Sequence, residues 1–354
     1  MRSRVGVVRL YALSICCFVL LASFILGCAT PRIEAPPPTT PPVPASPAAP
    51  PRIEVKFFPN FVAVIAQEGD SLASLSTKYL NDPSKDWFIA EFNEIDTLKP
   101  GQELIIPLKP YDKGGLTRNG YQTVPVLSYH QFSRTEARKM VVTEAVFEEQ
   151  MKLLKDKGYR VITMDQLFDF LNFTAQIPKK SVVINIDDGW RSAYEIAFPI
   201  LKKYGYPATL FIYTDLITGS EKTLSWELVQ EMSNNGINIE CHSRTHRNFT
   251  KMEKKESFKE YFESVEKELS DSATIIKKRL NKEVKYFAYP YGDTNHLVIG
   301  LLRKKGFRGA FTVKREGNPF FIHPYRLNRS MIYGDYNLEQ FEKNLAAYTE
   351  ESLK

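Results

Sequence analysis

The stretch SVVINIDDG, residues 181–189, is a mostly apolar run that ends in two adjacent aspartates and a glycine. A short run rich in branched apolar residues is typical of a strand that is buried on both faces. Carboxylates that directly follow such a strand lie at the carboxyl edge of a parallel sheet, where α/β proteins build their sites. The stretch therefore predicts a parallel sheet together with a candidate site.

The same alternation of apolar strands and amphipathic helices recurs on both sides of this stretch. We expect strands at 124–130, 181–188, 208–214, 237–243, 285–290 and 309–313, and helices at 143–158, 192–205, 225–236, 254–280 and 297–306. Strands that are separated by helices predict parallel βα units. The periodicity alone leaves a closed barrel and an open sheet both available.

Two histidines stand four residues apart at the end of another expected strand, in NIECHSRTH, residues 238–246. A divalent metal needs about three nitrogen or oxygen ligands and an open position for water. His242, His246 and one aspartate of the Asp187–Asp188 pair supply that number, and the other aspartate is then free to accept a proton from the water. We expect one divalent metal, zinc first, although cobalt, nickel or iron suit the same ligands.

Three motifs together resemble the polysaccharide deacetylase family, carbohydrate esterase family four: NIDDG, HSRTH and FAYPYG (residues 287–292). The resemblance covers about residues 120–335 and implies a distorted (β/α) barrel with fewer than eight strands. It also implies an enzyme that removes acetyl groups from N-acetylglucosamine units of a glycan. We therefore expect a deacetylase domain at 118–354.

The resemblance also assigns roles to individual residues. It implies that Asp187 is the catalytic base and that Asp188, His242 and His246 are the metal ligands. The backbone N–H of Tyr291 would help to hold the oxyanion.

Two positions depart from the family pattern. Ala288 stands where the family has an arginine that orients the catalytic aspartate, and we expect Arg326 or Arg329 in HPYRLNR to supply that charge. For the general acid, His323 in FIH matches the family position imperfectly, and His130 at the end of a strand is a rival.

A smaller segment, residues 57–110, reads as strand, helix, helix and strand. It resembles a LysM module through EGDSLASLSTKY, Asn93 and LKPGQELIIP. The resemblance implies binding of a glycan that contains N-acetylglucosamine, through Gly69, Asp70, Ser71 and Asn93. A structural cap for the next domain is the alternative.

The N-terminus has the features of an export signal. Arginines precede an apolar run that ends in ILGC, which resembles a bacterial lipobox and predicts a signal peptide at 1–27 and lipidation of Cys28. A proline-rich spacer follows at 28–56. We expect a lipoprotein on the extracytoplasmic side of the bacterial envelope, at the outer membrane, with an uncleaved anchor as the alternative.

The composition, 43% hydrophobic and 25% charged, is that of a globular protein. The net charge of +6 is spread along the chain and predicts no nucleic-acid partner. Cys241 is the only cysteine after Cys28, so no intrachain disulfide is expected in the body. The sequence leaves the oligomeric state open. We expect a deacetylase of peptidoglycan, and the alternatives are a poly-N-acetylglucosamine deacetylase, an ester hydrolase and a glycan-binding protein without catalysis.

Overall fold

The computed structural model describes residues 55–351. The predicted signal peptide, the predicted lipidation site at Cys28 and nearly all of the proline-rich spacer lie outside these residues. Within residues 55–351, none of the helices is long and apolar enough to cross a bilayer.

The smaller segment forms the predicted strand–helix–helix–strand arrangement. Its elements are β1 (Lys56–Phe57), β2 (Phe61–Ile65), α1 (Leu72–Leu80), a 3₁₀ turn (Pro83–Lys85), α2 (Asp86–Phe92) and β3 (Glu103–Pro107). The three strands pair antiparallel in the order β1-β2-β3. A separate small core forms from Val62, Val64, Ala66, Leu75, Ile89, Leu104 and Ile106.

The larger segment is built on a curved parallel sheet, as the alternation of strands and helices predicts. In the described chain its strands follow the order β14-β13-β12-β11-β10-β6-β15, and every pair in this path is parallel. The strands are β6 (Val126–Tyr129), β10 (Ser181–Asp188), β11 (Ala208–Ile212), β12 (Ile237–Cys241), β13 (Tyr286–Ala288), β14 (Gly309–Phe311) and β15 (Ser330–Met331). A further short strand, β9 (Arg160–Val161), pairs with β10.

One segment links the two edges of this sheet. Ser330 and Met331 of β15 pair with β6, and Leu327, three residues earlier, makes a parallel bridge with Phe311 of β14. The sheet is thereby curled into a distorted barrel, as expected.

Alternation along β10 decides which side chains enter the barrel. Val182, Ile184 and Ile186 pack in the large core that includes residues of the surrounding helices, whereas Val183 packs in an inner cluster with Phe211 and other residues. Because successive side chains point to opposite faces of a strand, Asn185 and Asp187 share the inner face with Val183.

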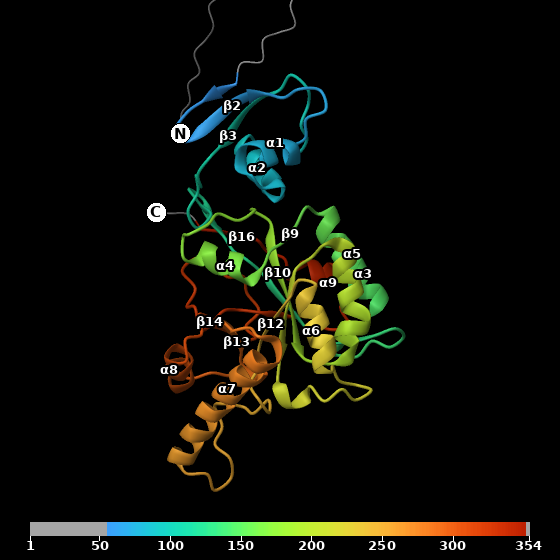
Figure 1. The fold of residues 1–354 in the computed structure, drawn as a ribbon, viewed down its shortest axis with the longest axis vertical. Coiled ribbons are helices and arrows are strands. Elements are labelled where there is room, and N and C mark those ends of the chain that lie inside the picture. Colours follow the sequence, from blue (N-terminus) through green and yellow to red (C-terminus); the bar gives the residue numbers. More distant parts are fainter. Residues whose placement is uncertain (1–54, 352–354) are drawn as a thin grey trace, which may run out of the picture. The chain divides into compact units, whose positions relative to one another are not determined.

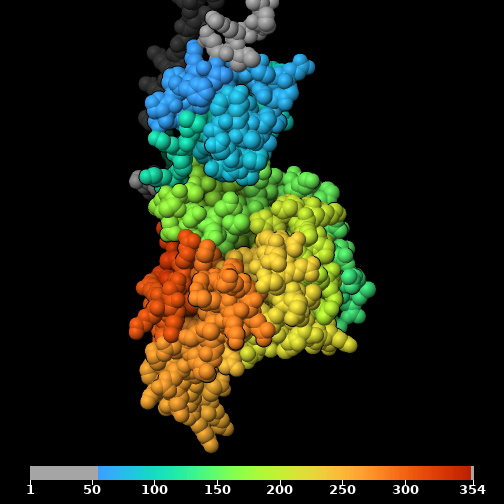
Figure 2. All heavy atoms as spheres, in the orientation of Figure 1, coloured from blue at the N-terminus to red at the C-terminus, as the bar shows by residue number. Residues whose placement is uncertain are grey.

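The helices pack around this sheet, and α3 and α5 lie side by side (Figure 1). Their bounds are α3 (Glu144–Asp156), α4 (Met164–Leu171), α5 (Phe198–Tyr204, preceded by a π-helical turn at Ala193–Ala197), α6 (Trp226–Asn234), α7 (Phe258–Leu280), α8 (His296–Lys304) and α9 (Leu338–Glu342). All the predicted helices are confirmed, whereas α4 and α9 were not predicted. The beginning of α7 and the loop before it project from the neighbouring elements (Figures 1 and 2).

Short strands outside the main sheet also escaped prediction. They are β4 (Leu116–Thr117), β5 (Gly120–Gln122) and β16 (Tyr348–Glu350), which pair antiparallel, and β7 (Gln131–Ser133) and β8 (Val141–Thr143), which pair parallel. Strands of two or three residues carry too few side chains to show a period of two.

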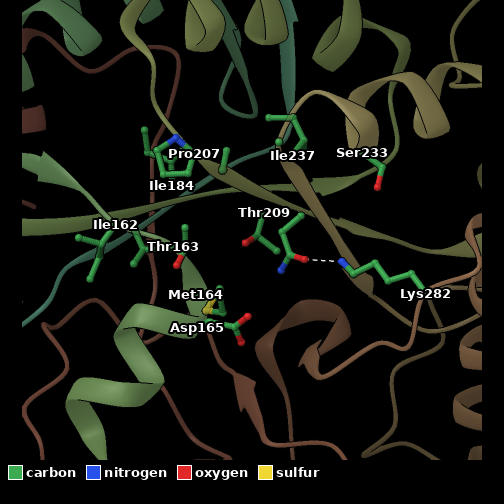
Figure 3. Close-up of a pocket in the computed structure, with 14 residues that line it drawn as sticks. Ile162, Thr163, Met164, Asp165, Ile184, Pro207, Thr209, Ser233, Ile237 and Lys282 are labelled. Atoms are coloured by element: carbon green, nitrogen blue, oxygen red, sulfur yellow. Dashed lines mark hydrogen bonds between the residues drawn. The ribbon is translucent and has the colours of Figure 1, made fainter. Parts of the chain in front are cut away.

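A cavity of about 400 Å³ opens where β10, β11 and β12 begin, and Val183, Ala208 and Ile237 line it. Figure 3 shows Lys282 reaching into this region and bonding to the side chain of Asn238. The Lys282 ammonium also donates to the carbonyl oxygen of Ile239 at 2.8 Å. None of the predicted site residues lines this cavity, which lies at the strand ends opposite to the aspartate pair.

Candidate metal centre and proton-transfer site

The two adjacent aspartates diverge at the end of β10. Asp187 points into the barrel and is 1% exposed. Asp188 has a φ of +79°, a left-handed backbone conformation that is uncommon outside glycine, and its side chain stays partly accessible. The turn therefore separates the two carboxylates by direction as well as by burial.

Asp188, His242 and His246 come together as the sequence predicts. One oxygen of Asp188, Oδ1, lies 3.7 Å from Nε2 of His242 and 3.7 Å from Nε2 of His246. The three ligand atoms lie within 4.8 Å of one another. His246 reaches this position through a tight turn after β12, in which Ser243 has a φ of +75° and His246 a φ of +65°.

The protonation states and hydrogen bonds of these three side chains suit the binding of a cation. Burial lowers the pKa of His242 to about 4 and also lowers the pKa of His246, so both imidazoles are neutral near pH 7. Nδ1 of His242 lies 2.7 Å from the carbonyl oxygen of Ala288, which assigns the proton to Nδ1 and leaves Nε2 free. Trp190 Nε1 donates to the second oxygen of Asp188 at 2.8 Å. The three side chains therefore fit a divalent metal, although the donor set does not identify it.

Asp187 is held by a buried arginine. Nη1 of Arg329 donates to both carboxylate oxygens at 2.8 Å, and Nε donates to the carbonyl oxygen of Thr312 at 3.0 Å. Ser128 Oγ adds a longer bond to Asp187 Oδ2 at 3.4 Å. Burial raises the pKa of Asp187, but the charge of Arg329 outweighs burial and leaves that pKa below its usual range. Asp187 is consequently an ionised carboxylate inside the barrel.

The expected arginine is therefore Arg329 and not Arg326. Arg329 is fully buried, whereas Arg326 is exposed. Leu327 and Arg329 lie two residues apart in the segment that closes the barrel, so both side chains point inward and that of Arg326 points out. Ala288, which stands at the position where the resemblance implies an arginine, lies in the inner apolar cluster.

Of the two histidines considered for the general acid, only His130 lies near Asp187. Its Nε2 is 3.9 Å from Asp187 Oδ2, and its side chain is 15% exposed. His323 is exposed and contacts Arg303 and the backbone N–H of Tyr325 instead. Because it precedes Leu327 by four residues, it lies toward the opposite ends of the strands, and the expectation for His323 is corrected on this ground.

Tyr291 lies in a tight turn after β13, with a φ of +61°. Tyr291 is 61% exposed, and its ring meets the His246 ring edge to face, with the centroids 4.8 Å apart. Gly292 is required in this turn, because a Cβ there would lie 2.4 Å from a methyl carbon of Val313. The role of the Tyr291 N–H as an oxyanion donor stays a prediction.

In the smaller segment, three of the four residues expected to bind glycan have side-chain hydrogen bonds within the segment, and Asp70 accepts from the N–H of Gln67 at 2.7 Å. The Asn93 side chain donates to the carbonyl oxygens of Ile89 and Ile105 and accepts from the N–H of Ile105, so it joins α2 to β3. Ser71 caps α1 by accepting from the N–H of Ser74. Asn93 therefore holds α2 against β3, and glycan recognition by Gly69, Asp70, Ser71 and Asn93 stays a prediction.

Two contacts at the site were not predicted from the sequence. Ser128 lies two residues before His130 in LSYH, and Trp190 directly follows the DDG turn. Their proximity to motif residues was the only available signal, and neither a serine in a strand nor a tryptophan after a turn indicates a hydrogen bond to a carboxylate.

Comparisons with known proteins find relatives of this chain. The profile of the family described as Polysaccharide deacetylase matches residues 174–310. A poly-beta-1,6-N-acetyl-D-glucosamine N-deacetylase of Staphylococcus aureus is 30% identical over 213 residues, which are 58% of this chain and 73% of that protein.

The fold is also similar to that of solved structures. A polysaccharide deacetylase from Bacillus cereus is 26% identical and superposes with a TM-score of 0.54, covering 71% of this chain and 74% of its own. IcaB from Ammonifex degensii is 24% identical with a TM-score of 0.57, covering 65% of this chain and all of its own, and at this identity it supports the fold alone.

Proposed function

Because this chain belongs to the polysaccharide deacetylase family, we propose that it is a metal-dependent N-deacetylase that acts on N-acetylglucosamine units of a cell-envelope glycan. The observation that carries the proposal is that two adjacent aspartates have carboxylates in different environments. Asp187 is buried and ionised beside Arg329, while Asp188 faces the imidazoles of His242 and His246.

Asp188, His242 and His246 would hold the metal. The chemistry that a divalent cation supplies at such a site is Lewis-acid activation of water and of the acetamide carbonyl. Zinc is our first expectation, and cobalt, nickel or iron would suit the same ligands. The neutral imidazoles and the fixed Nδ1–H of His242 keep both Nε2 atoms available near pH 7.

The residues of the chain itself account for the proton transfers. Asp187 accepts a proton from the attacking water while the water oxygen forms a bond to the acetamide carbon. Arg329 and Ser128 hold the carboxylate in place for this transfer. The carbon–nitrogen bond then breaks as the leaving nitrogen receives a proton, because an unprotonated amide nitrogen is a very poor leaving group. His130, 3.9 Å from Asp187, is the side chain that we assign to this second transfer. The N–H of Tyr291 is the proposed oxyanion donor.

Peptidoglycan is the substrate that we propose first. The support is the resemblance of residues 57–110 to a LysM module, which would hold the enzyme on a polymer that contains N-acetylglucosamine. Lipidation at Cys28 would tether the protein to a membrane on the extracytoplasmic side, with the outer membrane as our expectation. Poly-N-acetylglucosamine is the second candidate, because the Staphylococcus aureus relative carries that activity in its name.

The proposal is tested by amine release from peptidoglycan and from poly-N-acetylglucosamine, with the metal-loaded protein beside an Asp187→Asn variant. We expect amine from at least one polymer and a loss of about 100-fold or more in the variant. No amine from either polymer, with the metal bound and the protein folded, would refute N-deacetylation of these glycans.

A further inference from the structure

Two tyrosines and two cations gather beside the catalytic centre without taking part in it. The rings of Tyr333 and Tyr336 meet edge to face with their centroids 5.4 Å apart. The Arg315 guanidinium lies 5.6 Å from the Tyr333 centroid and 5.4 Å from that of Tyr336, and the Lys139 ammonium lies 5.4 Å from that of Tyr333. We call these four residues the Tyr333 cluster.

Three loops build this cluster, and backbone contacts fix them to one another. Arg315 follows β14 and donates through Nη2 to the carbonyl oxygen of Met331 at 3.0 Å. Gly334 donates its N–H to the carbonyl oxygen of Lys139 at 3.3 Å. A Cβ at Gly334 would lie 1.9 Å from the carbonyl oxygen of Val141, so the loop that carries Tyr333 sits tightly on the β7–β8 segment.

Two sets of backbone contacts place the Tyr333 cluster close to Asp187 and His130. Thr312, whose carbonyl accepts from Arg329, precedes Arg315 by three residues, so their Cα atoms are at most about 10 Å apart. On the other path, Gln131, the residue after His130, donates its N–H to the carbonyl oxygen of Met140, and Lys139 directly precedes Met140. A polymer bound at the centre could therefore extend over the cluster.

Cationic neighbours of the cluster form ion pairs with carboxylates, whereas its own two cations do not within residues 55–351. Arg138 pairs with Glu136 at 2.7 Å, and Lys314 pairs with Glu316 at 2.7 Å. Across residues 55–351, by contrast, no ion pair within 4.0 Å joins Arg315 or Lys139 to a carboxylate. Two exposed cations against one ring repel each other, and a bound anion would relieve that repulsion.

We propose that the Tyr333 cluster is a subsite for a carboxylate carried by the glycan chain, next to the acetamide that is hydrolysed. The arginine fork and the ammonium would bind the carboxylate, and the tyrosine faces would contact the sugar ring. This inference rests on the proposed deacetylation and selects its substrate class. A glycan with lactyl or peptide carboxylates, such as peptidoglycan, fits the subsite. Poly-N-acetylglucosamine has no carboxylate, and the amines formed as it is deacetylated would be repelled.

The test uses full-length protein and an Arg315→Ala/Lys139→Ala double variant, with Lys314→Ala as a matched control that removes a neighbouring, paired cation. Amine release is measured on soluble peptidoglycan fragments, on the same fragments with their carboxylates methyl-esterified, and on a neutral N-acetylglucosamine oligomer. We expect the double variant to raise KM about tenfold on the carboxylated fragments alone, with kcat unchanged, since two exposed charge contacts together are worth about a factor of ten. Lys314→Ala should behave as wild type.

A binding measurement separates failure of the subsite from failure of the proposed function. In an Asp187→Asn background, the carboxylated fragments should bind about tenfold more weakly when Arg315 and Lys139 are also replaced. If no substrate releases amine but this difference in binding persists, deacetylation is refuted and the subsite stands. Equal effects on carboxylated and esterified fragments, or no effect on either, would overturn the subsite.

Discussion

Replacing Arg329 by Met should destabilise the protein strongly, because the Asp187 carboxylate is then buried without its cation. Arg329 and Asp187 are each no more than 1% exposed, and Arg329 makes two bonds to Asp187 and one to Thr312. Breaking a buried pair by removing one partner costs about 3–5 kcal/mol. That cost corresponds to a fall of about 10 °C in melting temperature for a domain of this size.

The dependence on pH follows from the same pair. In the wild type the folded pKa of Asp187 is lowered, so its stabilising effect is present above the unfolded pKa and is lost as the pH falls. In Arg329→Met, burial without the arginine raises that pKa, and protonation relieves the penalty. The difference in stability between variant and wild type should therefore be full at neutral pH and should shrink in acid.

Chemical denaturation of four proteins tests this reasoning: wild type, Arg329→Met, Asp187→Asn and the double variant. We expect the two single effects to be non-additive by about 2–3 kcal/mol, because the double variant has no buried charge left. Arg326→Met is the matched control and should change stability by about 0.5 kcal/mol or less, since Arg326 is exposed. Additive effects, or equal losses for Arg326→Met and Arg329→Met, would refute the role given to the buried pair.

Three further predictions concern the metal centre and its neighbours. His130→Gln should lower kcat by about 100-fold or more whereas His323→Gln leaves it nearly unchanged, and equal kinetics for the two variants would contradict the assignment. Trp190→Phe removes the bond to the Asp188 carboxylate and should weaken metal affinity by about tenfold or more in a competition assay with a chelator, with kcat at saturating metal nearly retained. Metal-stripped protein should lose about 3 kcal/mol of stability between pH 6.5 and about 4, because buried His242, with a pKa of about 4, stays neutral while the unfolded chain takes up a proton. A His242→Asn variant should lack this loss, and an identical pH profile for the two proteins would argue against it.

Much of the fold was predictable because its strands and helices are long enough to show a period. Each expected strand of the sheet formed at its place, and the SVVINIDD run became β10. The short strands β4, β5, β7, β8 and β16 were missed because two or three residues carry no readable pattern. The sequence did not predict whether the barrel closes, for a related reason. Closure depends on the few β-sheet pairs made by Leu327, Ser330 and Met331 and not on a long strand.

The part of the candidate site that was predictable consists of residues that directly follow a predicted strand and belong to a recognisable motif. Asp188, His242 and His246 meet because their strands end at the same edge of a parallel sheet. The choice of Arg329 over Arg326 depended on which residues of the closing segment point inward, and the sequence does not define the register of that segment. His323 was misplaced for the same reason.

The central claim, that the aspartate and histidine side chains form a metal-dependent amide-hydrolysing centre, is tested most directly by amine release from peptidoglycan and poly-N-acetylglucosamine at defined metal content. We expect activity to rise with bound metal toward one ion per chain and to be lost on chelation. It should also be lost in Asp187→Asn, which keeps the metal ligands. Amine release that persists without metal, or in folded Asp187→Asn, would contradict this account.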